Sequence, residues 1–169
     1  MAQTMHNPTR FQGREGEDMI IICDTREQKP FSFKRWDVEV QRAKLDVGDY
    51  ALAGMEGRAA IERKEINDLV ACLQGENRDR FERELSLARA YDLFVVVVEG
   101  SVSDLARGNY TSNMQPESAL QSVAAFFTRY GIPFLFADSR SGAEYWTYSL
   151  LAKHRREIEK RYKALCAGD

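Results

Sequence analysis

The spacing of apolar and polar residues predicts several strands after a polar start. Residues 1–18 are polar and lack periodicity, and we expect a disordered tail there. Residues 19–23 form an unbroken apolar run typical of a buried strand, and residues 38–45 alternate as a partly exposed strand does. Residues 50–53 and 59–64 flank a turn bounded by glycines, which favours a hairpin.

Helical and strand patterns alternate in the rest of the chain. Residues 66–73 carry the apolar stripe of a helix that ends at Gly75, and a second amphipathic helix follows. Residues 94–98 are apolar throughout, as in a strand covered on both faces. The remaining elements are a helix over 119–130 with Pro116 in its first turn, a strand over 133–137 and a helix over 143–165. A strand, a β meander and then alternating helices and strands predict an α/β fold, a mixed sheet sandwiched by helices.

Composition and charge narrow the class of protein. A chain of 169 residues with 44% hydrophobic residues suits one globular domain. The net charge of −2 argues against a protein that coats DNA through general basicity, but it allows a local basic groove. Three widely spaced cysteines, Cys23, Cys72 and Cys166, favour reduced thiols in the cytoplasm. With only His6 and His154 a histidine-based metal site is not expected, and no apolar run suits a membrane span.

Residues with nuclease chemistry gather at the predicted hairpin. Asp49 opens one of its strands, and Glu62 and Lys64 lie two apart on the other. Because residues i and i+2 of a strand share a face, Glu62 and Lys64 point the same way, whereas Arg63 points to the opposite side. Cleavage of a phosphodiester bond with a hard divalent cation requires carboxylates beside a positive charge. The pattern therefore indicates a metal-dependent nuclease site.

A solvated surface is the simpler interpretation, since 30% of the residues are charged. The placement of the residues favours catalysis. Glu62 and Lys64 lie at the carboxyl end of a predicted strand, where open sheets place their sites. Asp24, Arg26 and Glu27 follow another apolar strand in the same way.

The same residues form a motif. The pattern G-D-x(n)-E-R-K-x(3)-D is present as Gly48, Asp49, Glu62, Arg63, Lys64 and Asp68, and D-x-R-E precedes it as Asp24, Thr25, Arg26 and Glu27. In these motifs, and over about residues 19–137, the chain resembles the XPF-type structure-specific endonucleases. The resemblance implies a restriction-endonuclease-like fold. It also implies a Mg²⁺- or Mn²⁺-dependent cut in branched or flapped DNA, near single/double-strand junctions, in repair, recombination or replication.

Roles follow from the resemblance and from the strand geometry. Asp49 and Glu62 are expected to bind the metal directly. Asp24 is expected to be a third ligand or to act through water, and the backbone carbonyl of Arg63 could complete the shell. Lys64 is expected to orient the attacking water or to stabilise the five-coordinate phosphate.

Several charged residues have a functional and a simpler interpretation. Arg26 and Arg63 are candidates to hold phosphate oxygens, or they form ion pairs with Asp68 or Glu27. Glu27 and Asp68 are expected to support the ligands. An acid in the first turn of a helix, as Asp68 would be, is stabilised there in any case.

DNA contacts are expected from the second amphipathic helix and from a polar loop over 107–114. Arg78 and Arg80 could follow phosphates beside the active site, or they belong to a solvated helix face. Tyr110 could stack on an unpaired base, or it packs on the surface of the protein.

The chain departs from the family pattern in two places. Nothing corresponds to tandem helix-hairpin-helix domains, and residues 29–36 leave no room for a helix between the first two strands. Both departures are similar to compact stand-alone versions from bacteria and phages. We therefore expect a cytoplasmic, nucleoid-associated protein, which would act in the host cytoplasm if phage-encoded.

We expect a tail (1–18), a nuclease domain (19–140) and a C-terminal helix (141–169) that packs on the core or on a second subunit. The resemblance implies a homodimer, for which 119–130 and 145–151 offer apolar surface. A partner protein could supply junction selectivity. Two alternatives stay open: less selective nicking or exonuclease activity, and a non-catalytic DNA-binding or dimerisation partner. The presence of every expected catalytic residue argues against the second.

Overall fold

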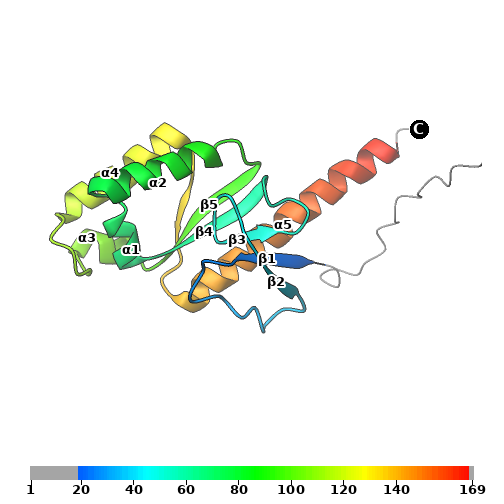
Figure 1. The fold of residues 1–169 in the computed structure, drawn as a ribbon, viewed down its shortest axis with the longest axis horizontal. Helices are drawn as coiled ribbons and strands as arrows, with labels where there is room; N and C mark the ends of the chain where they lie inside the picture. The colour runs from blue at the N-terminus through cyan, green and yellow to red at the C-terminus, as the bar shows by residue number, and fades with distance from the viewer. Residues whose placement is uncertain (1–18, 168–169) are drawn as a thin grey trace, which may run out of the picture.

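Residues 19–167 are described by a computed structural model, and they form a six-stranded sheet with helices on both faces (Figure 1). The strands are β1 (Ile20–Asp24), β2 (Glu39–Ala43), β3 (Tyr50–Leu52), β4 (Ala59–Glu65), β5 (Leu93–Glu99) and β6 (Phe134–Phe136). The helices are α1 (Ile66–Ala71), α2 (Gly75–Ala88), α3 (Val102–Arg107), α4 (Pro116–Tyr130) and α5 (Arg140–Cys166). The predicted α/β class is confirmed, and the tail expected over 1–18 lies outside the described residues.

The sheet mixes parallel and antiparallel pairs in the order β2-β1-β3-β4-β5-β6. β1 is parallel to β2 and antiparallel to β3; β3 and β4 form the predicted hairpin; β5 is parallel to both β4 and β6. The expected meander is wrong, because β2 lies beyond β1 and not beside β3. β1 is buried and takes a partner on each edge, whereas β2 is mostly exposed and suits the border of the sheet.

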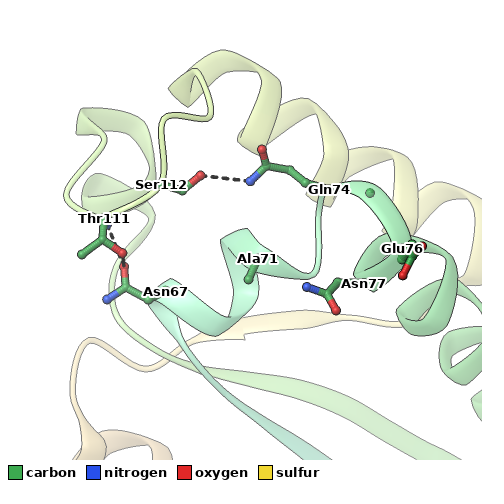
Figure 2. Close-up of a pocket in the computed structure, with 8 residues that line it drawn as sticks. Asn67, Ala71, Gln74, Glu76, Asn77, Thr111 and Ser112 are labelled. Carbon is green, nitrogen blue, oxygen red and sulfur yellow. Dashed lines mark hydrogen bonds between the residues drawn. The ribbon is translucent and has the colours of Figure 1, made fainter.

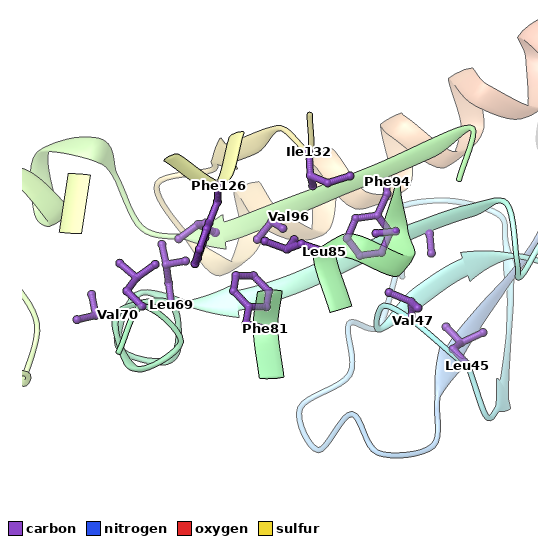
Figure 3. Packing of buried hydrophobic residues seen from close by; sticks show 14 of the residues in the cluster. Leu45, Val47, Leu69, Val70, Phe81, Leu85, Phe94, Val96, Phe126 and Ile132 are labelled. Carbon is purple, nitrogen blue, oxygen red and sulfur yellow. The ribbon is translucent and has the colours of Figure 1, made fainter. Parts of the chain in front are cut away.

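Helices α1, α2 and α4 cover one face of the sheet, and Figure 3 shows the packing there. Phe94 and Val96 of β5 point to this face and lie in one cluster with Phe81 and Leu85 of α2. Phe126 of α4 meets Phe81 edge to face, with ring centroids 5.8 Å apart. Burial of this apolar surface, at about 25 cal/mol per Å², holds α2 and α4 on the sheet.

The opposite face is covered by α5 and by the connection from β1 to β2. Phe31 stacks on Tyr50 of β3 at 5.0 Å between centroids, and Phe33 meets the same ring edge-on at 5.6 Å. The Phe31 N–H donates to the Tyr50 hydroxyl at 2.8 Å. Between Asp24 and Glu39, all of which the structure describes, there is no helix, as the short sequence predicts.

Two helices differ from the sequence pattern. α3 was not anticipated, because its six residues are too few to show a periodic stripe. Its start is fixed by reciprocal hydrogen bonds between Ser101 and Asp104, and Gly108 ends it in the left-handed conformation. Gly75, expected only to end the preceding helix, is also the first residue of α2.

α5 packs its first half on the sheet and then extends beyond it (Figure 1). Leu151 is fully buried, and Tyr148 stacks on Trp36 at 4.4 Å between centroids. Farther along, Tyr162 and Leu165 are 64% and 79% exposed. Within residues 19–167, none of the helices is long and apolar enough to cross a membrane.

Candidate active site

Gly48 leads into β3 through a backbone conformation that a side chain would obstruct. Its φ is +86°, and a Cβ here would lie 3.1 Å from the Cβ of Ala60 and 3.2 Å from the carbonyl oxygen of Ile61. The next residue, Asp49, donates its N–H to Ile61 at 2.9 Å and accepts the N–H of Asp24 at 2.8 Å. Asp49 is therefore fixed between β1 and β4.

Glu62 and Lys64 lie on the same face of β4 and next to Asp49. The Lys64 ammonium forms an ion pair with Glu62 and lies 5.2 Å from the ring centroid of Phe81. The backbone N–H of Arg63 donates to the Asp49 carboxylate at 2.8 Å. The structure thus brings together three of the residues that the sequence selected.

Glu84 of α2 joins this cluster and was not anticipated. Its carboxyl group is hydrogen-bonded to Glu62 and is close enough to Lys64 and Asp49 to interact with their charges. The buried stripe of α2 contains Phe81 and Leu85, so Glu84 lies at the edge of that stripe. An acid at the border of an apolar helix face is the signal that could have identified it.

The cluster contains more carboxyl groups than cationic groups. Burial raises the pKa of Asp49, and the neighbouring Glu62 carboxylate raises it further. Burial and repulsion by Glu62 likewise raise the pKa of Glu84. Burial by itself lowers the pKa of Lys64, but attraction to Glu62 outweighs it, and the net direction is upward. Lys64 therefore remains a charged ammonium among carboxyl groups.

The donor set suits a hard divalent cation. Mg²⁺ and Mn²⁺ prefer carboxylate oxygens, and a cation would relieve the repulsion among Asp49, Glu62 and Glu84. Over the described range, no three His, Cys, Asp or Glu side chains already converge as a metal cage. The Lys64 ammonium instead donates a hydrogen bond to Oε1 of Glu62. Metal binding by Glu62 through that oxygen therefore requires the ammonium to move away from it.

The Arg63 side chain lies on the other face of β4, in a network of ion pairs. Its Nε lies 2.6 Å from Glu99, its Nη2 2.9 Å from Glu65 and its Nη1 3.4 Å from Glu27. Arg140 shares Glu99 at 3.2 Å. The simpler interpretation of Arg63 as a partner of Glu27 in an ion pair is therefore confirmed. Because its side chain is only 6% exposed, Arg63 has little surface left for a phosphate.

The Asp24 carboxylate is occupied by Arg26 and Leu45. One oxygen accepts the backbone N–H and Nε of Arg26 at 2.8 and 2.7 Å. The other accepts Nη2 of Arg26 and the N–H of Leu45 at 3.1 and 2.7 Å. Burial acts to raise the pKa of Asp24, but these hydrogen bonds outweigh it and lower the pKa. Asp24 therefore adjoins Asp49 through the backbone, while its side chain holds Arg26.

Arg78 connects α2 to α4. Its guanidinium donates to the Leu73 carbonyl and to the Ser122 hydroxyl, both at 3.1 Å. It also lies 4.7 Å from the ring centroid of Phe126. These contacts make Arg78 part of the packing between two helices.

The other DNA-binding and supporting candidates lie apart from the cluster. Arg80 is exposed on α2, and Asp68 is exposed in the first turn of α1. Tyr110 is half-buried and donates its hydroxyl to the Met114 carbonyl at 2.9 Å. Of these residues, Arg80 is the most accessible to a phosphate.

Comparison with known proteins agrees with this architecture. The model of the ERCC4 domain matches residues 23–150. XPF from Aeropyrum pernix is similar with a TM-score of 0.63 and 23% identity, covering 78% of this chain and 59% of that one. The same protein in complex with DNA gives a TM-score of 0.63 and 22% identity, covering 82% of this chain and 66% of that one.

These matches establish the fold, and the chain spans less than two thirds of the length of either structure. The expected XPF-type nuclease core and its restriction-endonuclease-like fold are therefore confirmed. No curated protein matches the chain.

Proposed function

The chain belongs to the ERCC4 domain family, and we propose that it is a metal-dependent DNA endonuclease that cuts near single/double-strand junctions. The observation that carries the proposal is the cluster of Asp49, Glu62 and Glu84 around Lys64. Family membership and the likeness to a protein solved with DNA support DNA as the substrate. Flaps, forks and other branched DNA in repair, recombination or replication are the proposed targets.

Asp49, Glu62 and Glu84 are the residues that would hold Mg²⁺ or Mn²⁺. The ion would supply a Lewis acid that polarises the phosphate and activates water. The Arg63 carbonyl stays a candidate to complete the shell. We assign Asp24 a supporting role, because its carboxylate already accepts hydrogen bonds from Arg26 and Leu45.

Lys64 acts in this proposal through its charge. Without a metal, Glu62 and the Phe81 ring keep the ammonium within the cluster, and metal binding by Glu62 would free it to face the phosphate. Attraction to Glu62 raises the pKa of Lys64, so its ammonium keeps its proton in the metal-free cluster. A fixed positive charge stabilises the negative charge that develops on the phosphate during attack.

We further propose that the chain works as a homodimer. Phe127 of α4 is 53% exposed, and on the opposite face of the sheet Tyr145 and Trp146 of α5 are 49% and 40% exposed, so each helix offers apolar side chains to a second copy. A symmetric contact between two copies is the commonest way to cover such residues. A further partner protein could add junction selectivity.

One observation favours the non-catalytic alternative. The Lys64–Glu62 ion pair occupies one oxygen of a proposed metal ligand. A less selective nicking or exonuclease activity is the other alternative, and only the choice of substrate separates it from the main proposal.

A panel of labelled substrates tests the proposed cleavage activity against its two alternatives. Flap, fork, nicked and linear DNA are incubated with the protein in Mg²⁺, in Mn²⁺ and in EDTA, with Asp49→Asn as the control for contaminating nuclease. We expect cutting of flaps and forks that disappears in EDTA and in the variant. Equal cutting of linear DNA would favour the less selective enzyme. Binding without cutting in either metal would favour the non-catalytic partner.

A further inference from the structure

A polar cleft lies between the α1–α2 turn and the loop that joins α3 to α4 (Figure 2). Its volume of ≈ 570 Å³ falls in the range of small-ligand sites. Its polar lining consists of three side-chain amides, two hydroxyls and one carboxylate: Asn67, Gln74, Asn77, Thr111, Ser112 and Glu76. Such a lining offers hydrogen-bonding groups beside apolar surface of similar extent, to which Ala71 and Gly75 also contribute.

Hydrogen bonds across the cleft hold two of these amides in place (Figure 2). The carbonyl oxygen of Asn67 accepts the N–H and hydroxyl of Thr111 at 2.9 and 3.3 Å. The Nε2 group of Gln74 donates to the Ser112 hydroxyl at 3.0 Å. These bonds use one end of each amide. The NH₂ group of Asn67 and the carbonyl oxygen of Gln74 remain available as a donor and an acceptor.

The lining chemistry selects the kind of ligand. Among the described residues that line the cleft there is no lysine or arginine, and Glu76 would repel a phosphate. The edge of a nucleobase presents donors and acceptors side by side, which is what Asn, Gln and Glu side chains recognise. A base reaches such a site only when it is unpaired. A base combines such an edge with an apolar face, so the mixed lining of the cleft fits an unpaired base better than a phosphate.

The cleft is connected to the proposed active site through the β4–α1 junction and through α2. Asn67 lies just beyond the end of β4, the strand that carries Glu62 and Lys64. α2 begins at Gly75 in the cleft and carries Glu84 in the cluster, a separation of about 13 Å at 1.5 Å per residue. A DNA strand spans this distance within a few nucleotides, so one strand can pass the active site and reach the cleft.

We propose that the cleft binds one unpaired base of the DNA strand that passes the active site. It would thereby detect the single-stranded side of a junction. The inference rests on the proposed nuclease function, because it assigns a substrate contact to the same site.

Abasic substitution tests the proposal directly. A flap substrate receives a single abasic site at each successive position of its single-stranded arm, and affinity is measured in EDTA, so that no cutting occurs. We expect one position of the arm, within a few nucleotides of the cutting site, at which the wild-type protein loses about 5- to 100-fold in affinity. Other positions should have little effect.

Two tryptophan variants complete the test. Ala71→Trp fills the cleft from an exposed residue of its wall and leaves the hydrogen-bonded amides intact. It should weaken binding of the intact flap by a similar factor and abolish the response to the abasic site. The control, Ala90→Trp, adds the same ring at an exposed residue beyond the end of α2 and should behave as wild type. Circular dichroism confirms that both variants are folded.

The outcomes separate the two proposals. An abasic series without a position effect, or a position effect that survives in Ala71→Trp, overturns base binding by the cleft. Wild-type cutting of the intact flap in Mg²⁺ or Mn²⁺ is scored independently. A position effect without any cutting supports the cleft and overturns the nuclease function.

Discussion

The two sides of strand β4 differ in how their charges are compensated. On one side, Asp49, Glu62 and Glu84 surround a single ammonium, that of Lys64, and repulsion between carboxylates helps to raise the pKa of Asp49 and of Glu84.

On the other side, three carboxylates are matched in number by three cations. The carboxylates are Glu27, Glu65 and Glu99, and the cations are Arg63, Arg140 and Lys29. Successive residues of one strand therefore face an unbalanced and a balanced set of charges.

We infer from this difference that the balanced side of β4 stabilises the fold and that the unbalanced side binds a ligand. The balanced side connects β4 to β5, to the start of α5 and to the segment after β1, so it fixes the strand from several directions. A bound cation would stabilise the unbalanced side most, because it would offset the repulsion among the carboxylates there. Proteins commonly accept such local destabilisation at functional sites. The comparison predicts that substitutions on the two sides will affect different measurements.

The largest effect is expected from Asp49→Asn, or from Glu62→Gln, on the unbalanced side. Cleavage should fall by more than about 10³-fold, because each variant removes a proposed metal ligand. Asp49→Asn should not lower the free energy of unfolding, since it removes a carboxyl group that is buried near like charges. Single-turnover cleavage and urea denaturation measure the two quantities. Wild-type-like cutting by either variant would contradict the assignment.

Arg63→Ala, on the balanced side, should act mainly on stability. It leaves the mostly buried carboxylate of Glu27 without its cation and Glu99 with Arg140 alone, which costs about 3–5 kcal/mol of unfolding free energy. The matched control is Arg58→Ala at the exposed ion pair with Asp92, which should leave the urea midpoint unchanged. Equal and small shifts in both variants would remove the distinction between the two sides.

Lys64→Ala tests the neighbouring residue of the same strand. The cleavage rate should fall by about 10²- to 10³-fold, because the ammonium acts where charge develops in the transition state. The affinity for a flap, measured in EDTA at a temperature where the variant is folded, should stay the same. A loss of affinity in proportion to the rate would make Lys64 a phosphate contact instead.

The smallest effect is expected from Arg78→Ala, which tests whether an arginine near the site contacts DNA. Its contacts with Leu73, Ser122 and Phe126 predict a loss of about 1.5–3 kcal/mol in stability. Flap affinity should change less than in Arg80→Ala, which removes an exposed guanidinium. A larger loss of flap affinity in Arg78→Ala than in Arg80→Ala would indicate that Arg78 contacts DNA.

The site residues that the sequence identified follow from local rules, whereas the residue that it missed depends on contacts between segments far apart in the sequence. Asp49, Glu62 and Lys64 could be selected because a strand alternates its faces, which is a local rule. Glu84 could not, because its place beside Glu62 depends on how α2 packs across the sheet. The same holds for the sheet order, since the side on which β2 pairs with β1 is a long-range choice.

Arg63 shows both cases in one residue. The alternation of β4 predicts that its side chain leaves the face of Glu62 and Lys64. The sequence also suggested Glu27 as a partner, through the upstream motif. The contacts with Glu99 and Arg140 come from β5 and α5, and only the folded chain brings them there.

Gly48 and Asp49 will both tolerate few substitutions in a saturation mutagenesis library, for unrelated reasons. Any side chain at position 48 meets Ala60, Ile61 and Phe94 in a backbone conformation that favours glycine, so its variants will be depleted at the level of folded protein. Variants of Asp49 will accumulate as soluble, inactive protein. A screen for activity alone would score Gly48 as catalytic, and a parallel screen for protein abundance will assign it to the fold.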